Sequence, residues 1–495
     1  MRFSFLIKAA TAFALVAVFD RLFSDGFSGA RIGGFAGVWL VLLATARRDV
    51  QRSRGAWLAL GCAVLFAGSL IDDPGPLAWA LFWCALSIAA LLPRADRFDD
   101  ALHWAARLVI HAVAGLVRPI ADLRRVTRSR AGARVSLRGI LSILALPLAG
   151  GIVFIALFAA ANPLIAQAFA AFRLPSGWQI LLWGLVIVCI WPSLRPSPAV
   201  MRLAGRLPDA EPVLPGTSLP SVLIALAVFN AIFAVQNALD IAFLWSDRAL
   251  PDGMMQSDYV HRGAYPLIAT ALIAGVMALA MLRPGSASAR HPWARRLVTL
   301  WVAQNLVLVA SSVLRTLDYI DTSMLTAWRI AALIWMALVA LGLATICWRI
   351  LAERSARWLI NCNALAATVA LTACSFVDLG AIAASWNVRS DRPTAIDLCY
   401  LGQVGDGALL PLVELERRAM DAGTRDRVRY VREQILTDLS ARQGRWQSWT
   451  PRGARRLARS TAMLGPGPAR PVAVARPAWR NCDGSIGRPI PPARP

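Results

Sequence analysis

Charged and aromatic side chains stand at the ends of apolar runs in the second half of the chain. They are Asp240, Asp258, Tyr259, Arg262, Arg315, Asp318, Tyr319 and Arg329. A guanidinium group binds phosphates and carboxylates in a fixed fork geometry, so arginines gathered at one end of a helix bundle could hold an anionic solute or a lipid head group. The alternative is that these side chains only form ion pairs between helices, such as Arg315 with Asp318 or Arg329 with Asp240.

Amide and carboxyl side chains also lie inside the apolar runs, where each must find a partner or line a wet cavity. One run carries Asn230, Asn237 and Asp240 on a single helix face, because their spacings are seven and three residues. Together with Gln304 and Asp378 in two later runs, they predict a polar seam. Hydrogen bonds that simply hold helices together are the alternative for the amides.

Other chemistries find no support in the sequence. The four histidines are far apart, and no pair has the spacing of metal ligands, so no metal is expected. The phosphate-binding loop, the nucleophile elbow and the dinucleotide-binding glycine motif are absent, and no cofactor is predicted. Only Cys399 and Cys482 lie outside the apolar runs, and they could form a disulfide in an oxidising compartment.

Long apolar stretches must position these residues. The chain is 57% hydrophobic and only 16% charged, whereas soluble domains carry roughly 25% charged residues. The expected fold class is therefore all-α, a polytopic bundle of about eleven transmembrane helices. The apolar runs cover residues 4–22, 32–46, 56–71, 77–92, 139–163, 178–194, 219–245, 264–282, 297–315, 325–350 and 358–386.

Arginines concentrate in every second connection between these runs. They follow the second, fourth, sixth, eighth and tenth runs, and the other connections are nearly free of them. Basic loops stay in the cytoplasm, so the sequence predicts a bacterial inner-membrane protein with a cytoplasmic N-terminus and a periplasmic C-terminus. A signal peptide is the alternative for residues 1–30, but Asp20 and Arg21 interrupt the apolar stretch and favour an uncleaved first helix.

The net charge of +23 would suggest nucleic acid as the partner of a soluble protein. Here the arginines lie between membrane spans, where they set orientation and contact anionic head groups. The expected partners are therefore the lipid bilayer and anionic lipids, and no nucleic acid.

Two segments depart from the pattern of spans. Residues 93–138 have the spacing of an amphipathic helix, lying either on the cytoplasmic membrane surface or docked on the bundle. After residue 386 the composition becomes polar; residues 387–443 predict a small helical hairpin, and residues 444–495, rich in Pro and Arg, predict a disordered tail that could bind a protein partner. The remaining regions are 1–92 with four membrane helices, 139–218 with two spans and a loop, and 219–386 with a five-helix membrane core.

Several short motifs resemble a known bacterial family. They are Tyr259-Val-His-Arg-Gly-Ala-Tyr265, Ser311-Ser-Val-Leu-Arg315 with Asp318-Tyr319, Leu325-Thr326 with Arg329-Ile330, and Trp358-Leu-Ile-Asn361. They are similar to the polytopic membrane family called domain of unknown function 4173, over residues 220–415. The resemblance implies a multi-pass helical protein of the bacterial envelope without an assigned activity.

The leading functional hypothesis is that the C-terminal helices bind or transport an anionic solute or a lipid head group through the polar seam. A second hypothesis is a membrane enzyme acting on a phosphate-bearing lipid, with Arg262, Arg315 and Arg329 as a clamp. Its general base would be Asp258 or Asp318. A third is an envelope scaffold or sensor accessory protein whose tail binds a partner.

Overall fold

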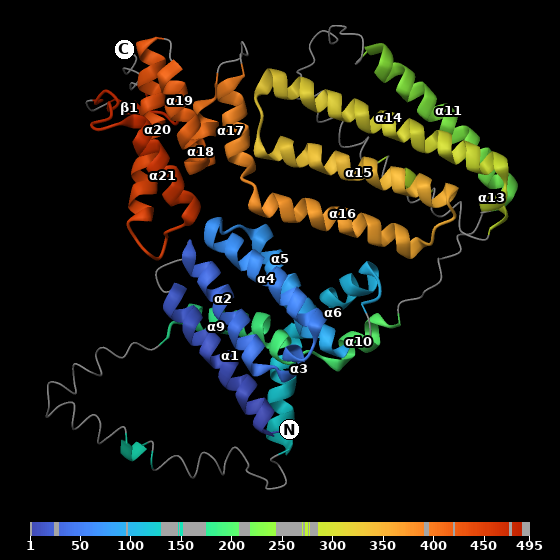
Figure 1. Ribbon diagram of the computed structural model, residues 1–495, viewed down its shortest axis with the longest axis horizontal. Coiled ribbons are helices and arrows are strands. Elements are labelled where there is room, and N and C mark those ends of the chain that lie inside the picture. Colours follow the sequence, from blue (N-terminus) through green and yellow to red (C-terminus); the bar gives the residue numbers. More distant parts are fainter. Residues whose placement is uncertain are drawn as a thin grey trace, which may run out of the picture.

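The computed structural model describes residues 2–23, 29–95, 98–129, 175–206, 218–243, 286–390, 396–418, 421–474 and 478–487, with residues 147, 149–151, 270, 273–275 and 277. Across these residues the protein is helical apart from one two-stranded hairpin. Figure 1 shows two helix bundles and a third group of helices, here called the tail module, that lies at one end of both.

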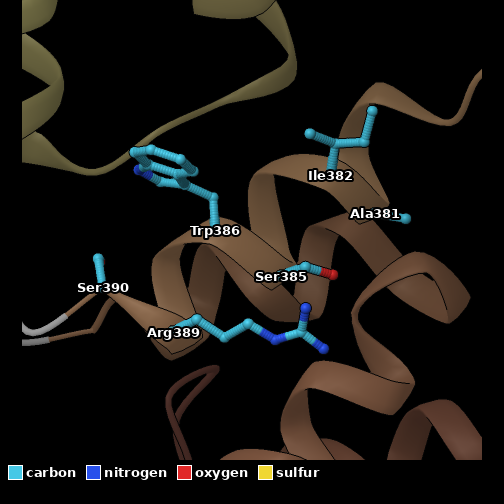
Figure 2. A pocket seen from close by; sticks show the side chains of 6 residues that line it. All are labelled: Ala381, Ile382, Ser385, Trp386, Arg389 and Ser390. Carbon is cyan, nitrogen blue, oxygen red and sulfur yellow. The ribbon is translucent and has the colours of Figure 1, made fainter.

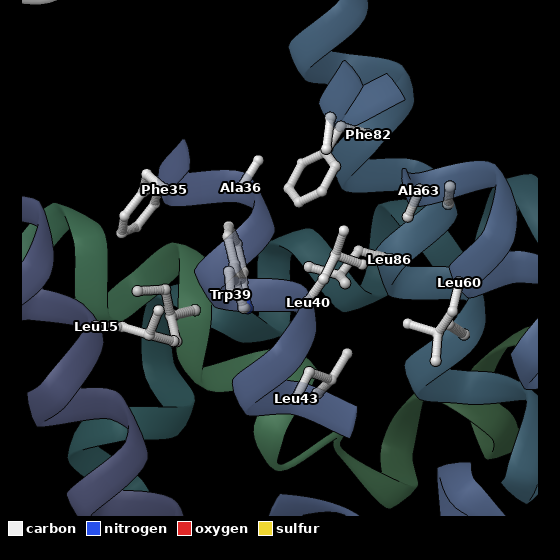
Figure 3. Packing of buried hydrophobic residues seen from close by; sticks show 14 of the residues in the cluster. Leu15, Phe35, Ala36, Trp39, Leu40, Leu43, Leu60, Ala63, Phe82 and Leu86 are labelled. Carbon is white, nitrogen blue, oxygen red and sulfur yellow. The ribbon is translucent and has the colours of Figure 1, made fainter. Parts of the chain in front are cut away.

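The N-terminal bundle consists of α1 (Arg2–Phe23), α2 (Ala30–Ala46), α4 (Arg54–Asp72), α5 (Pro76–Leu91) and α9 (Gly177–Leu194), with the short α3 (Arg48–Gln51) after α2. Its core is aliphatic and aromatic, and Leu15, Trp39, Leu43 and Phe82 are almost completely buried. Figure 3 shows side chains of α2 lying between Leu15 of α1 and the residues of α4 and α5. A Pro at the first position of α5 begins that helix after a tight turn, because its fixed φ suits a helix start.

The helix α6 (Ala101–Ser129) crosses one end of this bundle with an inverted burial pattern. It packs on α9, on α10 (Pro198–Ala204) and on the C-terminal bundle. Its polar residues Arg107, His111 and Asp122 are buried, whereas Val109 and Val113 are exposed. A bilayer favours this arrangement, since lipid accepts an apolar surface and cannot hydrogen-bond a polar one. The helix predicted within residues 93–138 therefore docks on the bundle through its polar face and presents its apolar face outward.

The C-terminal bundle consists of α11 (Leu219–Phe243), α14 (Pro292–Ser323), α15 (Ala327–Leu351) and α16 (Ala356–Phe376), with the single turn α13 (Ala287–Arg290) before α14. Its outer surface is apolar, and Trp328, for example, is 85% exposed. The run predicted as one span over 358–386 is broken, because α16 ends at Phe376 and α17 (Leu379–Arg389) begins after Asp378. The Asp378 carboxylate accepts a hydrogen bond from Ala381 N at 2.9 Å and caps α17, which ends the first helix.

Eight of the described helices are long and apolar enough to cross a membrane: α4, α5, α6, α9, α11, α14, α15 and α16. The helix α2 is apolar but shorter, at 17 residues. The fold class predicted from the sequence, an all-α polytopic membrane bundle, is confirmed. Most of the predicted spans at 139–163 and 264–282 lies outside the described residues.

The tail module is a small helical unit with its own core. The helices α17, α18 (Leu398–Val404), α19 (Leu409–Arg418) and α20 (Ala422–Gln443) surround Leu401, Leu412 and Val428, all fully buried. Two further elements follow, α21 (Pro451–Leu464) and a hairpin of β1 (Trp479–Arg480) and β2 (Ile486–Gly487).

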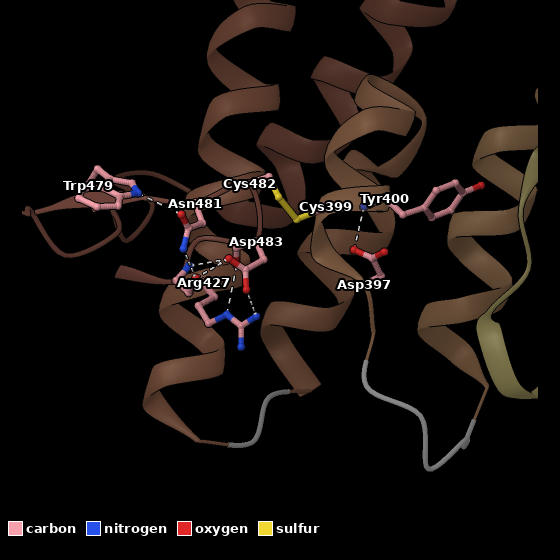
Figure 4. The surroundings of a disulfide bond; sticks show 9 residues. Asp397, Cys399, Tyr400, Arg427, Trp479, Asn481, Cys482 and Asp483 are labelled. Carbon is pink, nitrogen blue, oxygen red and sulfur yellow. Dashed lines mark hydrogen bonds and ion pairs between the residues drawn. A yellow bond between two sulfur atoms is a disulfide. The ribbon is translucent and has the colours of Figure 1, made fainter. Parts of the chain in front are cut away.

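The sequence-based prediction of disorder from residue 444 is wrong for α21 and the hairpin. A disulfide joins Cys399 of α18 to Cys482 of the hairpin, and Arg427 of α20 forms an ion pair with Asp483 beside it (Figure 4). Composition alone indicated disorder because arginines separated by Pro and Gly have no local partners, whereas the folded chain supplies carboxylates from distant segments.

Contacts between helix ends identify the two ends of each bundle. At one end of the N-terminal bundle, called here the arginine-rich face, Arg47 donates a hydrogen bond to the carbonyl of Ser193; at one end of the C-terminal bundle, Arg295 donates to the carbonyl of Leu351 at 2.8 Å. The other ends of the two bundles meet, because Ser69 Oγ donates to the carbonyl of Ser375 at 2.7 Å, and the tail module is attached there; this is the tail face. Within each bundle, arginines that follow alternate runs therefore gather at the end away from the tail face.

Reduction of the Cys399–Cys482 disulfide is expected to destabilise the tail module by about 2–4 kcal/mol, because it removes a constraint on the unfolded chain. The two cysteines are 83 residues apart in sequence. The measurement is the rate of trypsin cleavage in the hairpin of a Cys399→Ala variant in detergent. A Cys347→Ala variant, which loses a free thiol, is the control. Equal cleavage rates in both variants would contradict the prediction.

Candidate functional site

The predicted polar seam lies between α11 and α14. Asn230 Nδ2 donates to the carbonyl of Leu297 at 3.0 Å, and Asn230 Oδ1 accepts from Gln304 Nε2 at 2.9 Å. Further along both helices, Asn237 Nδ2 donates to the carbonyl of Gln304 at 3.2 Å. The amides therefore hydrogen-bond two neighbouring helices together, which is the structural alternative considered for them.

A buried ion pair closes the seam toward the tail face. Arg315 Nη2 donates to Asp240 Oδ1 at 2.6 Å, and the two side chains are 8% and 4% exposed. Gln236 Nε2 donates to the same oxygen at 3.0 Å. The carboxylate balances the charge of Arg315, so these contacts support a helix lock. The pairing of Asp240 with Arg329, suggested from the sequence, is not the one that forms.

Arg329 completes the turn between α14 and α15. Its Nη1 donates to the carbonyls of Ser323, at 2.7 Å, and of Met324. Its guanidinium lies 3.9 Å from the ring centroid of Tyr319, within the range of a cation–π interaction. Arg315 and Arg329 thus have separate partners, and Asp318 lies near the same end of α14. Three further members of the predicted set lie outside the described residues: Asp258, Tyr259 and Arg262.

Asp378 lies apart from the seam, at the junction between α16 and the tail module. It accepts a hydrogen bond from Arg456 of α21 at 2.5 Å. Burial raises the pKa of Asp378, but the hydrogen bond and the charge of Arg456 outweigh burial and hold that pKa below its ordinary value. The carboxylate is therefore ionised at neutral pH, and it anchors α21.

The helix α21 connects the two bundles on the tail face. Arg452 donates to Asp72 at 2.9 Å and to Asp73 at 2.8 Å, at the end of α4. The same guanidinium donates to the carbonyl of Phe376, at the end of α16, at 2.9 Å. One arginine therefore joins the N-terminal bundle to the C-terminal bundle, a structural role that its sequence context did not indicate.

A cavity of about 670 Å³ lies along one face of α17, between residues 381 and 390 (Figure 2). Its described lining includes Trp386 and Arg389. Arg389 Nε donates to Glu414 Oε2 at 3.1 Å, so its charge has a partner in the tail module. Nothing in the described lining makes this cavity a binding site for a charged ligand.

The arginine-rich face holds a set of cations that the sequence analysis did not single out. We call it the cation cluster: Lys8 of α1, Arg47 after α2, Arg94 after α5, Arg118 of α6 and Arg195 after α9, around the carboxylates Asp49 and Asp122. Five segments far apart in sequence contribute one cation each. The available signals were the alternation of basic loops and Lys8, the only lysine in the chain.

Arg47 is the buried member of the cation cluster, with a side chain that is 0% exposed. Its Nε donates to Asp49 Oδ1 at 3.1 Å, and its Nη1 donates to the carbonyls of Ala90 and Ser193 at 2.7 and 2.9 Å. Burial alone would raise the pKa of Asp49. The hydrogen bond from Arg47 and the charge of its guanidinium outweigh burial and hold the pKa of Asp49 below its ordinary value. Arg47 and Asp49 are therefore both ionised and balance each other.

Asp122 is the second carboxylate, and it is fully buried. Arg195 Nε lies 3.2 Å from Asp122 Oδ2, which also accepts a hydrogen bond from Trp191 Nε1 at 3.1 Å. Arg118 lies 3.6 Å from the other oxygen. Arg125 Nη1 lies 3.8 Å from that same oxygen, so one carboxylate faces three arginines. Lys8 forms no ion pair with any described residue. The cation cluster therefore contains more cations than carboxylates.

His111 of α6 lies beside the cation cluster and is 1% exposed. Neither ring nitrogen has a hydrogen-bond partner in the described chain. Arg47 and Arg94 are close enough to act on it electrostatically. Buried polar groups almost always have partners, so an imidazole without one marks a place where a further polar group is accommodated.

Comparison with known families assigns most of the chain to one family. A family model described as "Domain of unknown function (DUF4153)" matches residues 55–415, which include α4 to α9 of the N-terminal bundle, the whole C-terminal bundle and the first helices of the tail module. Lys8, Arg47 and Asp49 of the cation cluster precede this match, and α21 follows it. The motifs had indicated a shorter region and family 4173; the match is to a different family, also of unknown function. Neither the curated proteins nor the solved structures contain a match.

Breaking the Asp240–Arg315 pair is expected to destabilise the protein. Arg315→Met leaves a buried carboxylate without its counter-charge, which costs about 3–5 kcal/mol. The thermal unfolding midpoint in detergent should fall, and the double variant Asp240→Leu/Arg315→Met should recover much of the loss. An unchanged midpoint in Arg315→Met would contradict a structural lock and favour a role in ligand binding.

The attachment of α21 is expected to weaken in acid. The pKa of Asp378 is lower in the folded protein than in the unfolded chain. The stabilisation that the Asp378 carboxylate provides is therefore complete at pH values above the unfolded-state pKa of about 3.9. It is lost as the pH falls through the lower pKa of the folded state. Hydrogen exchange in α21, corrected for intrinsic rates, should stay slow from neutral pH and accelerate only in this acidic range.

Two variants test this assignment. Arg456→Met should weaken the attachment at neutral pH and remove its acid dependence, whereas the exposed Arg459→Met on the same helix should behave as wild type. Burial raises the pKa of Asp73, so protonation of this carboxyl at low pH favours the folded protein, opposite to the effect of Asp378. To remove this second pH dependence, Asp73→Asn is introduced in every protein compared. Identical pH profiles for the two arginine variants would contradict the prediction.

Proposed function

Because the chain belongs to the DUF4153 family, a family of unknown function, we propose its role from its contacts: it is an integral membrane protein that binds a phosphate-bearing anion at the cation cluster. The anion is either a lipid head group or a free phosphate ester, since both present the same oxygens to guanidinium and ammonium groups. The proposal concerns binding, and it locates the site in the N-terminal bundle.

The observation that carries the proposal is the charge imbalance of the cation cluster. The five cations of the cluster, together with Arg125 beside Asp122, face two carboxylates, and one of those carboxylates is paired with the buried Arg47. Lys8 and Arg94 lie within each other's electrostatic field and within that of Arg195. Bringing like charges together at the edge of a low-dielectric bundle is unfavourable, and a bound anion relieves that repulsion.

Arginines that only set membrane orientation would look different. Arg48 and Arg54, on the same face, extend outward with exposed side chains. Members of the cation cluster instead converge from five segments, and Arg195 also lies 5.3 Å from the ring centroid of Phe5. The unpartnered imidazole of His111 adds a group that can donate to an anion. Convergence and partial burial therefore favour a ligand site over simple orientation.

The proposal includes an orientation. By the positive-inside rule the arginine-rich face is cytoplasmic and the tail face is periplasmic, in a bacterial inner membrane. A disulfide in the tail module is consistent with an oxidising compartment on that side. The anion would then be a cytoplasmic solute or a lipid of the inner leaflet. In this proposal the seam between α11 and α14 stabilises the bundle and is not the route of a solute.

Removing one cation is expected to weaken anion binding. Lys8→Met or Arg195→Met should lower the affinity for dioleoyl phosphatidic acid by about tenfold or more, the loss of roughly one charge-assisted hydrogen bond. Native mass spectrometry of the protein in detergent measures bound lipid directly. Competition by glycerol phosphate would identify a free ester as a ligand, and a failure to compete would favour the lipid.

The matched control is Arg48→Met, which removes an exposed arginine from the same face. It should bind like wild type, and binding by wild type should weaken as ionic strength rises, because exposed charges are screened. Dioleoyl phosphatidylcholine, which has the same chains but no net charge, should bind more weakly than dioleoyl phosphatidic acid. Equal binding of both lipids, or wild-type affinity in Lys8→Met and Arg195→Met, would contradict the proposed function.

A further inference from the structure

We infer that the ligand of the cation cluster is a lipid and that an apolar cavity inside the N-terminal bundle holds its hydrocarbon chain. This inference rests on the proposed function and specifies its ligand class. Three observations support it: the lining of the cavity is apolar, two residues of its lining are exposed on the outer surface of α9, and two hydrogen bonds connect the cavity to the cation cluster.

The cavity has a volume of about 380 Å³ and lies among α1, α2, α4, α5 and α9. Five aromatic rings line it: Phe19, Phe23, Phe35, Trp39 and Trp79. The rest of the described lining is aliphatic, apart from one thiol and the turn between α4 and α5, and none of the described lining residues is charged. A ligand that fits such a lining is hydrocarbon, since any polar group would lose its hydrogen bonds there.

One wall of the cavity is accessible from outside the bundle. Leu185 and Cys189 line it from α9, and both are exposed. The helices α4, α5 and α9 are long and apolar enough to span a membrane, so the medium at that wall is lipid. Chains can therefore enter sideways from the bilayer, without crossing a polar surface.

The deep end of the cavity contacts the cation cluster through one residue. Trp39 lines the cavity, and its Nε1 donates to Ser193 Oγ at 3.1 Å. The carbonyl of the same Ser193 accepts from Arg47 Nη1 at 2.9 Å. Figure 3 shows Phe35 and Trp39 on the same stretch of α2, and Arg47 follows the C-terminal end of that helix. Head group and chain sites are thus adjacent.

This arrangement orients the lipid. Its anionic head lies at the arginine-rich face, and its chain runs along α2 and α9 toward the Pro74-Gly75-Pro76 turn at the tail face. The charge of the cation cluster favours the anionic head group, and the aromatic lining favours the hydrocarbon chain because burying apolar surface is favourable. The two selections are independent and can be tested separately.

The test compares dioleoyl and dihexanoyl phosphatidic acid, which share a head group and differ in chain length. Native mass spectrometry should find that wild type prefers the long-chain lipid. Filling the cavity with Cys189→Trp should abolish this preference and lower dioleoyl binding by about tenfold. Leu185→Trp is a second filling variant, should the first fold poorly. Leu181→Trp is the control, because Leu181 is exposed on α9 and does not line the cavity.

The outcomes separate the two proposals. Loss of the chain-length preference in the filling variants, but not in Leu181→Trp, supports the inference. If wild type shows no preference, or if both filling variants keep it while Lys8→Met still weakens binding, the inference is overturned and the proposed function stands. If Cys189→Trp weakens dioleoyl binding and Lys8→Met does not, the chain and head sites are unconnected, which also overturns it.

Discussion

The buried guanidinium of Arg47 is the interaction on which the N-terminal bundle depends. A charge in that position is tolerated only when it is fully paired, and Arg47 meets this condition with Asp49 and with the carbonyls that end α5 and α9. Those bonds hold three helix ends in register. They also position Ser193, and through it the indole of Trp39, so the cation cluster and the apolar cavity have a common structural origin.

The lipid bilayer explains why many apolar side chains are exposed and many polar side chains are buried in the helices. Exposed side chains of α6 and α15 are apolar, whereas amides, carboxylates and an imidazole are buried. In lipid a polar group finds no partner outside the protein, so each one must turn toward another helix. The bonds between α11 and α14 follow this rule. They make the most polar stretch of the C-terminal bundle a contact between helices, although its composition alone suggested a solute path.

Features set by residues close together in sequence were predicted correctly, whereas contacts between residues far apart in sequence were not. Apolar runs and alternating arginines are local patterns imposed by the bilayer, so they indicated the helices and their common face. The spacing of Asn230 and Asn237 correctly placed them on one side of α11. Interaction partners could not be predicted in the same way: Arg315 binds Asp240 across 75 residues, and α21 is held by Asp378, 78 residues away, and by Asp72, 380 residues away. The cation cluster was invisible for the same reason, since each segment contributes a single charge that is ordinary in its own loop.

The contacts of Arg452 have a consequence for how the protein is made. The helices α4 and α16 leave the ribosome well before residue 452 is synthesised, yet Arg452 joins the end of one to the end of the other. The two bundles must therefore insert and approach each other without this connection. Only after α21 has been delivered to the tail face can its arginines reach Asp72, Asp73 and Asp378. The docking of α21 is then a late event outside the spans, and until it occurs Asp72, Asp73 and Asp378 lack the arginine partners that α21 provides.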